Sequence, residues 1–293
     1  MKYVLLLLLL TCPIFSKPIL ISFDDTASIS CWEETLDFAK ENKVKLTYFV
    51  SAASFVTQEE GKNYWGLKEL KTQMNMDFVK PKEAYFIKAR FIMLERAIAE
   101  GHELASHLCG HYAGGKFTRE QWDKEFAYTI MVFKNYPMFG VRAPYLEVND
   151  AYFEIVKELQ WYDSSLCVNS KGKYFTKDYE FDYNSFEIPV RAIKIITEGG
   201  PLLTNGKKTF CIPFDTSFVE EYSRCSELDR ETFFKSLCYD YLNRKSPTQI
   251  CLHFSKDGLK SYRYAMEDFV KWVKIQKDKP NFVTYKEYYE SKN

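Results

Sequence analysis

Two histidines, His107 and His111, have a spacing that suggests a chemical role. The chain contains four histidines, and these two lie four residues apart. Four residues are close to one helical turn, so both imidazoles can point in the same direction. A catalytic zinc ion usually takes three protein ligands and leaves one position for water. A histidine pair by itself is more often a packing or surface feature, so a metal site needs a further ligand.

The adjacent carboxylates of Asp24 and Asp25 are candidates for that ligand. They end the apolar run 18–23, whose β-branched content predicts a buried strand. Carboxylates at such a position can also simply cap the following helix. The choice between the two interpretations depends on whether the aspartates and the histidine pair meet in the fold.

Strands and helices are expected to alternate along most of the chain. The strand at 18–23 is followed by a helix over 32–41, a strand over 44–50, a helix over 86–100 and a strand over 102–106. Further helices are predicted over 119–136, 150–160, 232–243 and 262–277, and further strands over 139–142, 249–254 and 282–284. Strand, helix and strand in succession form right-handed parallel units. We therefore expect an α/β fold, a single-domain, distorted (β/α) barrel of parallel strands, with segment 54–82 inserted as a lid.

The candidate residues share one position in this scheme, at or just after the end of a predicted strand. Barrels of this class place their chemistry at the carboxyl ends of their strands. The residues are Asp24, Asp25, His107, His111, Arg142, Asp163 and His253. Taken singly, Arg142 also fits a surface turn, Asp163 a helix cap and His253 a buried structural histidine.

Composition limits the classes of function. The 293 residues include 46% hydrophobic side chains, enough to bury a large core. The formal net charge is +0, from 40 basic and 40 acidic residues, so nucleic-acid binding is disfavoured. Aromatic residues make up 17% of the chain, which suits either an aromatic core or an aromatic-lined groove for sugars. We expect a monomer.

The first residues are typical of an export signal. Met1 and Lys2 precede an apolar run over 4–10 that is too short to span a bilayer. We expect a signal peptide over 1–16 and a folded domain over 17–293, in a protein that is secreted or lies in a cell wall or extracellular matrix. An uncleaved anchor and a lipoprotein are the alternatives. No second apolar run of membrane length follows, so we expect no other membrane insertion.

The cysteines leave their pairing open. The chain has 8 cysteines, and removal of Cys12 with the signal peptide would leave an odd number. An oxidising destination favours disulfides and leaves at least one thiol unpaired. Cys211 and Cys225 bracket a short loop and are the favoured pair. Cys109, between the two histidines, could be a fourth metal ligand, half of a disulfide or an inert loop residue.

Five short motifs connect these candidates to a known family. They are Ser22–Asp25, His107–His111, Arg142–Tyr145, Asp163–Ser164 and Leu252–His253. Each motif is weak alone, but in this order they resemble the five motifs of the polysaccharide deacetylases of the NodB-homology type, carbohydrate esterase family 4. The resemblance covers roughly residues 19–285, and the segments 141–146 and 162–165 are similar to the chitin deacetylases of insects.

The resemblance implies a metal-dependent deacetylase that acts on an acetylated polysaccharide such as chitin. Asp25, His107 and His111 would bind zinc, and the same ligands would also accept cobalt. Asp24 would be the general base that takes a proton from water. Arg142 would pair with Asp24 and keep it away from the metal.

The resemblance also assigns the remaining groups. Tyr145 would supply a backbone N–H to the oxyanion. His253 would be the general acid for the leaving amine, and Asp163 would hold it in the correct tautomer. Leu252 would line the acetyl pocket.

Departures from the family pattern concern the pocket rather than the catalytic groups. Thr26 stands where many members have glycine, Leu108 replaces a serine or threonine, and Tyr112 replaces a common proline. No tryptophan follows Asp163–Ser165, although many active members have one there. The first hypothesis is a secreted N-deacetylase acting on N-acetylglucosamine residues of chitin or chito-oligosaccharide. The alternatives are a catalytically weak relative that binds cell-wall glycan as a structural component, and an O-acetyl esterase acting on xylan.

Overall fold

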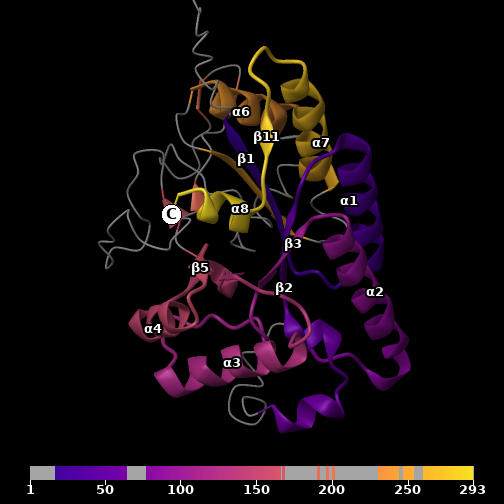
Figure 1. The fold of residues 1–293 in the computed structure, drawn as a ribbon, viewed down its shortest axis with the longest axis vertical. Helices are drawn as coiled ribbons and strands as arrows, with labels where there is room; N and C mark the ends of the chain where they lie inside the picture. The colour runs from indigo at the N-terminus through magenta and orange to yellow at the C-terminus, as the bar shows by residue number, and fades with distance from the viewer. Residues whose placement is uncertain are drawn as a thin grey trace, which may run out of the picture.

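A curled sheet of seven parallel strands forms the centre of the computed structural model (Figure 1). The strand order is β10-β1-β2-β3-β4-β5, and β11 pairs with the start of β1. The strands are β1 (Pro18–Asp24), β2 (Thr47–Val50), β3 (Glu103–Ser106), β4 (Gly140–Val141), β5 (Tyr162–Asp163), β10 (Thr248–His253) and β11 (Asn281–Phe282). Neighbours follow chain order, and a late strand returns beside the first. This is the winding of a barrel rather than of a doubly wound sheet, so the predicted distorted (β/α) barrel in a single domain is confirmed.

The structure describes residues 17–64, 77–165, 167–168, 190–191, 196–197, 200–201, 230–243, 247–253 and 260–292. Two short strand pairs lie outside the main sheet: β6 (Cys167–Val168) with β7 (Val190–Arg191), and β8 (Ile196–Thr197) with β9 (Gly200–Pro201). The predicted signal peptide, the favoured Cys211–Cys225 pair and part of the predicted lid fall outside the described residues. Within them, Cys31, Cys109, Cys238 and Cys251 are free thiols.

Most helices lie on the outer side of the sheet, and the last one lies at the amino ends of the strands. In Figure 1, α1 and α2 run along the right of the strands, α3 and α4 lie below, and α6 and α7 lie above. The helices are α1 (Ile29–Asn42), α2 (Tyr85–Ala99), α3 (Arg119–Val132), α4 (Asp150–Glu158), α6 (Arg230–Asn243), α7 (Lys260–Lys274) and α8 (Tyr285–Glu290). Short 3₁₀ turns are η1 (Ala52–Phe55), η2 (Glu60–Asn63), η4 (Pro81–Glu83) and η5 (Pro144–Leu146). The helices predicted from apolar spacing are confirmed, with ends that differ by a few residues.

Side-chain alternation along the strands divides the apolar residues into two clusters. On β1, Ile19, Ile21 and Phe23 belong to the larger cluster, which includes buried residues of the outer helices. The residue between the first two, Leu20, belongs to a small cluster inside the barrel, together with Phe49, Ala105, Tyr162 and Tyr285. The inward face of β1 therefore continues from Leu20 through Ser22 to Asp24, which places polar groups at the carboxyl end of the barrel interior.

Glu103 closes the opposite end of the barrel. Its carboxylate accepts hydrogen bonds from the Thr47 hydroxyl (2.9 Å), the Tyr162 hydroxyl (2.7 Å) and the backbone N–H of Lys286 (2.9 Å). These contacts join β2, β3, β5 and α8 at the amino ends of the strands. Burial raises the pKa of Glu103 to about 7, although its three donors oppose the shift.

This buried carboxyl predicts a pH dependence of stability. The pKa of Glu103 is higher in the folded chain, about 7, than its ordinary value of 4.5. Its contribution to the free energy of unfolding is therefore fully present below pH 4.5 and is lost as the pH rises through 7. The difference corresponds to about 3 kcal/mol. We expect Glu103→Gln to remove this part of the decline, as measured by urea unfolding at pH 4.5, 6, 7 and 8.

The exposed carboxylate of Glu154 offers a control, since its side chain is 64% exposed. Glu154→Gln should show the pH dependence of the wild type. A difference between wild type and Glu103→Gln that stays constant over this pH range would show that Glu103 does not titrate as described.

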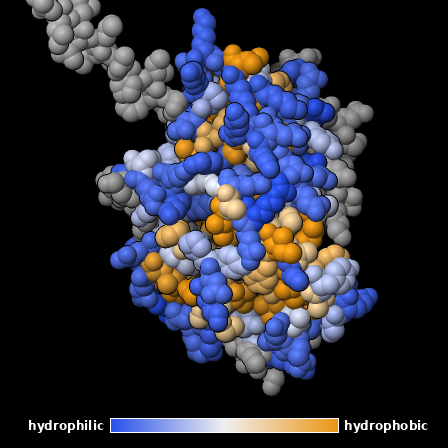
Figure 2. All heavy atoms as spheres, turned by 45° about the vertical axis from the view of Figure 1, so that its right-hand side comes forward, coloured by the Kyte–Doolittle hydropathy of each residue, from blue (hydrophilic) through white to orange (hydrophobic). Residues whose placement is uncertain are grey.

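Figure 2 shows the face that α1 and α2 present to solvent. It is mostly hydrophilic in its upper half, and apolar residues gather lower down, at the height of α2 and α3. The exposed apolar side chains of these two helices include Ile92, Ile98, Ile130 and Met131. A membrane-spanning helix is not found among the described residues, since each helix there is too short or too polar to cross a bilayer.

Candidate metal centre

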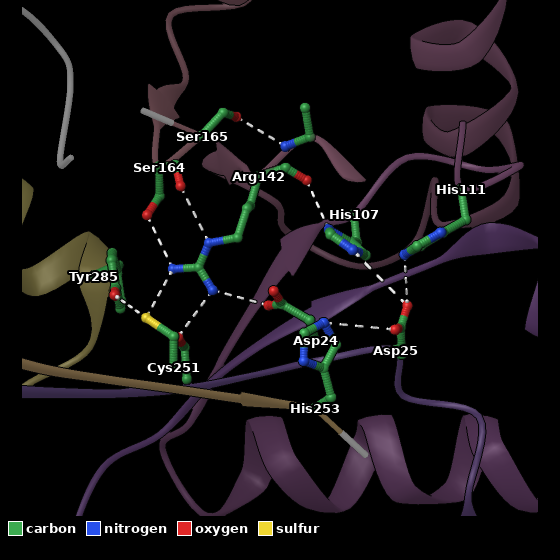
Figure 3. Close-up of polar contacts among 12 residues, drawn as sticks. Asp24, Asp25, His107, His111, Arg142, Ser164, Ser165, Cys251, His253 and Tyr285 are labelled. Carbon is green, nitrogen blue, oxygen red and sulfur yellow. Dashed lines mark hydrogen bonds and ion pairs between the residues drawn. The ribbon is translucent and has the colours of Figure 1, made fainter. Parts of the chain in front are cut away.

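Asp25, His107 and His111 come together at the carboxyl ends of β1 and β3 (Figure 3). The Nε2 atom of His111 lies 3.2 Å from Oδ1 of Asp25, and Nε2 of His107 lies 3.8 Å from the same oxygen. One ligand atom from each residue lies within 4.8 Å of the others. Zinc–ligand distances of about 2.0–2.2 Å place tetrahedral ligand atoms about 3.4 Å apart. A divalent ion therefore fits between these three side chains with small adjustments.

The loops that carry these ligands have an unusual backbone. Outside glycine, a positive φ is uncommon, and each such residue costs about 1–3 kcal/mol. Five of them surround the cluster: Asp25 (φ 57°), Leu108 (61°), His111 (53°), Tyr145 (56°) and Leu146 (57°). The two histidines thus converge through left-handed turns in a loop, and not through the helical turn that their spacing suggested.

His107 is oriented by a hydrogen bond on its far side. Its Nδ1 atom lies 2.7 Å from the backbone oxygen of Arg142, so Nδ1 carries the proton and donates it. Nε2 is then the unprotonated nitrogen that faces Asp25. Burial lowers the pKa of His107 to about 4, against the raising effect of Asp24 and Asp25. The imidazole is therefore neutral at pH 7, as metal binding requires.

Buried polar atoms that face one another support a metal at this position. Among the described residues, His107 Nε2 is buried and has no hydrogen-bond partner, and the buried Asp25 Oδ1 faces the imidazole nitrogens of His107 and His111. Buried polar atoms in native proteins are nearly always paired, so these two atoms fit ligands of a cation. Burial by itself raises the pKa of Asp25, but the imidazoles of His111, His107 and His253 outweigh it and hold that pKa well below its usual range. An ionised carboxylate with two imidazoles suits zinc, and also cobalt.

Glu125 of α3 holds the loop between the two histidines. Its Oε2 atom accepts the backbone N–H groups of Cys109 (3.0 Å) and Gly110 (3.1 Å). Burial raises the pKa of Glu125 to about 7, against these two bonds. Cys109 itself is a buried free thiol outside the ligand cluster, and burial raises its pKa above the ordinary value. An inert loop residue is therefore the interpretation of Cys109 that fits the structure.

Asp24 has a different partner from its neighbour. Its Oδ1 atom lies 2.8 Å from Nη1 of Arg142, and both side chains are fully buried. The second oxygen, Oδ2, has no hydrogen-bond partner among the described residues. The left-handed backbone at Asp25 turns the two adjacent carboxylates in different directions, as Figure 3 shows. One carboxylate thus faces the imidazoles and the other keeps a single oxygen available beside them.

The guanidinium of Arg142 is enclosed on every side. It donates to Ser22 Oγ (3.0 Å), the Ser164 backbone oxygen (3.1 Å) and Ser164 Oγ (2.9 Å), and it lies 3.9 Å from the Phe49 ring centroid. Cys251 Sγ lies 3.6 Å from Nη2 (Figure 3). Sequence reasoning missed these partners. Ser22 could have been found, because it lies two residues before Asp24 and therefore on the same face of β1.

The two residues at the end of β10 point to opposite sides. Nε2 of His253 lies 3.8 Å from Asp25 Oδ2, and its side chain is 17% exposed. Leu252 is 2% exposed and packs in the larger cluster, with Phe23 as its register partner. The structure therefore brings His253 to the polar cluster and places Leu252 in the core between sheet and helices. The predicted part of Leu252 in an acetyl pocket stays a prediction.

Tyr145 and Asp163 occupy different parts of the site. The ring of Tyr145 lies 5.0 Å from that of His111, in the turn that follows Arg142. The described contacts of the Asp163 carboxylate are with Tyr152 and Ser165, and none of them is with His253. The predicted oxyanion role of Tyr145 and the predicted acid role of His253 stay predictions that these positions allow.

Residues 15–162, half of the chain, match a family model described as polysaccharide deacetylase. This segment contains the aspartate pair, the histidine pair and Arg142. The chain therefore belongs to the polysaccharide deacetylase family, and the resemblance carried by the five motifs is confirmed at that level.

Similar solved structures share the fold at low sequence identity. The carbohydrate esterase 4 domain of a multidomain xylanase from the hindgut metagenome of Trinervitermes trinervoides has a TM-score of 0.51 and 17% identity, covering 94% of this chain and 91% of that one. A peptidoglycan deacetylase from Bacillus subtilis has a TM-score of 0.51 and 14% identity, covering 95% and 92%. A carbohydrate esterase 4 pseudoenzyme from Bacillus anthracis has a TM-score of 0.53 and 9% identity, covering 94% and 66%. No curated protein matches this chain.

The ligand cluster predicts a specific response to zinc. A ligand that binds only the folded state stabilises it, by about 2.7 kcal/mol at a concentration of 100 Kd. We expect zinc to raise the free energy of unfolding of the wild type by this order, and His111→Gln to lose most of that gain. His102→Gln is the control, because His102 accepts the Leu46 N–H and lies outside the cluster. Urea unfolding with and without zinc, with bound metal measured directly, tests this; an equal zinc response of wild type and His111→Gln would contradict it.

Proposed function

We propose that this protein is a secreted, zinc-dependent deacetylase that removes acetyl groups from N-acetylglucosamine residues of chitin or chito-oligosaccharides. One observation carries the proposal: a carboxylate with a single available oxygen, Asp24, lies directly beside a three-residue cluster suited to a divalent metal. Hydrolysis of an acetamide needs an activated water, stabilisation of an oxyanion and a proton for the leaving amine. The residues of this site fit each need.

The base is Asp24. Its Oδ1 is held by Arg142, so Oδ2 can accept a proton from a water that lies between it and the substrate carbonyl. Asp25, His107 and His111 would hold the zinc ion, which would polarise the acetyl carbonyl and lower the pKa of the attacking water. Because Arg142 fixes Asp24 from the far side, the base stays out of the ligand set.

The acid and the oxyanion donor lie on either side of this centre. His253 stands on the β10 side of Asp25, where it can give a proton to the leaving nitrogen. Tyr145 stands on the His111 side, where its backbone N–H can stabilise the developing negative charge. Removing one such donor costs about 10²–10³-fold in kcat in other hydrolases.

Acetate release from defined substrates tests the proposal. Purified protein with measured zinc content is incubated with chito-oligomers, peptidoglycan and acetylated xylan, with and without a chelator. We expect acetate from chito-oligomers, lost on chelation and restored by zinc or cobalt. Release from acetylated xylan alone would identify an O-acetyl esterase. Tight glycan binding without acetate release at any zinc or cobalt concentration would identify a glycan-binding relative.

A further inference from the structure

Tyr152, Asp163 and Ser165 form a buried chain of hydrogen bonds beside the catalytic groups. All three side chains belong to residues with no exposed surface. The Tyr152 hydroxyl donates to Asp163 Oδ1 at 2.6 Å, and the Ser165 hydroxyl donates to the same oxygen at 2.6 Å. The Ser165 backbone N–H donates to Oδ2 at 2.9 Å. The carboxylate of Asp163 therefore fixes both the side chain and the backbone N–H of Ser165.

Ser165 connects Asp163 to the turn that contains Tyr145. Its Oγ accepts the backbone N–H of Ala143 at 2.8 Å (Figure 3). Because a carboxylate can only accept, the Ser165 proton points to Asp163, and a lone pair of Oγ is left to accept the Ala143 N–H. The next residue back, Arg142, is held by Ser164 through both its backbone oxygen and its hydroxyl. Consecutive residues after β5 thus hold consecutive residues after β4.

The turn needs such support because of its backbone. Tyr145 (φ 56°) and Leu146 (φ 57°) are consecutive non-glycine residues in the left-handed region. A strained conformation persists only where its surroundings restrain it. The Ala143 N–H lies two residues before Tyr145, at the start of η5, and its bond to Ser165 ties this start to the sheet. The position of the Tyr145 N–H then depends on Ser165 and, through it, on Asp163.

We propose that Asp163 and Ser165 are positioning residues for the turn 142–146, and that they act on the oxyanion side of the reaction rather than on His253. The catalytic half of this inference rests on the proposed function. The structural half, that Ser165 restrains the turn, does not. Asp163 has contacts with Tyr152 and Ser165 among the described residues, and these lead to Ala143, whereas His253 lies beside Asp25.

Three variants and two measurements test the proposal. Ser165→Ala removes the acceptor of the Ala143 N–H, and Asp163→Asn weakens the support of Ser165. We expect each to lower kcat on chito-oligomers by about 10- to 100-fold with KM within about 2-fold, because a misplaced donor loses transition-state stabilisation. The kcat of the double variant should lie within about 3-fold of the kcat of the less active single variant, because both substitutions act through one chain of hydrogen bonds. The pH midpoints of kcat should stay where the wild type has them.

A control variant and a structural measurement test the restraint of the turn separately from its effect on catalysis. Thr248→Val removes a buried hydroxyl at the amino end of β10 that has no hydrogen-bond partner among the described residues, and it should leave kcat unchanged. Amide hydrogen exchange of Ala143 should be at least about 10-fold faster in Ser165→Ala than in wild type and Thr248→Val. Thermal unfolding of every variant checks that it is folded.

Each outcome decides either the catalytic half or the structural half of the proposal. A shift of one kcat pH midpoint in Asp163→Asn, absent in Ser165→Ala, would assign Asp163 to His253 and overturn the proposal. An unchanged kcat in Ser165→Ala would also overturn it. If the wild type releases no acetate, the proposed function fails, while faster Ala143 exchange in Ser165→Ala would still support the restraint of the turn and unchanged exchange would reject it.

Discussion

Asp24→Asn is expected to lower kcat by about 10²–10⁴-fold while leaving metal content close to that of the wild type. The range is the usual contribution of a general base. Asparagine has the shape of aspartate and keeps one oxygen that can accept from Arg142, which lies 2.8 Å away. The amide nitrogen that replaces the second oxygen cannot take a proton from water. Acetate release from chito-oligomers and metal analysis of the same sample measure both effects.

The neighbouring residue offers a matched control. Asp25→Asn changes the same functional group one position along the chain, but at a ligand within 3.2 Å of His111. We expect it to lose metal together with activity, so that added zinc restores part of the rate in Asp25→Asn and none in Asp24→Asn. A kcat within about 3-fold of wild type in Asp24→Asn would remove Asp24 from the role of base. Loss of metal in that variant would instead make it a ligand.

Arg142→Met is expected to have the largest effect on stability, about 3–5 kcal/mol. It leaves the carboxylate of Asp24 buried without its cation, and breaking one side of a buried pair costs this much. Burial lowers the pKa of Arg142, but the charge of Asp24 outweighs it and raises that pKa above its ordinary value. Methionine fills part of the space between Phe49 and Tyr285 but satisfies none of the polar partners. Urea unfolding of the metal-free proteins measures the loss.

A double-variant cycle separates the charge from the packing. In Asp24→Asn/Arg142→Met the unpaired charge is absent, so we expect this protein to be more stable than Arg142→Met alone. Arg119→Met is the surface control: Arg119 pairs with Glu158 at 37% exposure, and such pairs contribute about 0–1 kcal/mol. A loss in Arg142→Met no larger than in Arg119→Met would show that the buried pair does not support the fold.

The sites at strand ends were predictable because strand ends can be located from apolar runs. The runs before Asp24, His107, Arg142 and His253 are buried strands, and all of them are parallel. Parallel strands bring their carboxyl ends to one edge, so residues at those ends must meet. The alternation of side chains along a strand also predicts which face Leu252 occupies. Leu252 precedes His253 directly, so the two must point to opposite faces, and the core position of Leu252 follows from that.

Other features had no signal in the sequence. The histidine pair has helical spacing, yet it lies in a loop whose convergence depends on positive φ at Leu108 and His111. The role of Glu125 depends on the packing of α3 under that loop. Helical periodicity can place Glu125 on the inward side of α3, away from the exposed Glu120, but it does not identify the loop whose N–H groups Glu125 accepts.

The sequence by itself determined the chemical groups, the parallel barrel that gathers them and the family, because residue types and hydrophobic periods are local properties. Only the tertiary structure decided which partner each of the two adjacent carboxylates has. Asp24 faces a buried guanidinium and Asp25 faces two imidazoles, since the backbone turns left-handed between them. It likewise decided that Asp163 contacts Ser165, because that contact depends on how the loops after β4 and β5 lie against each other. Hydrogen-bond partners of this kind are set by distances between segments, and sequence patterns carry no such distances.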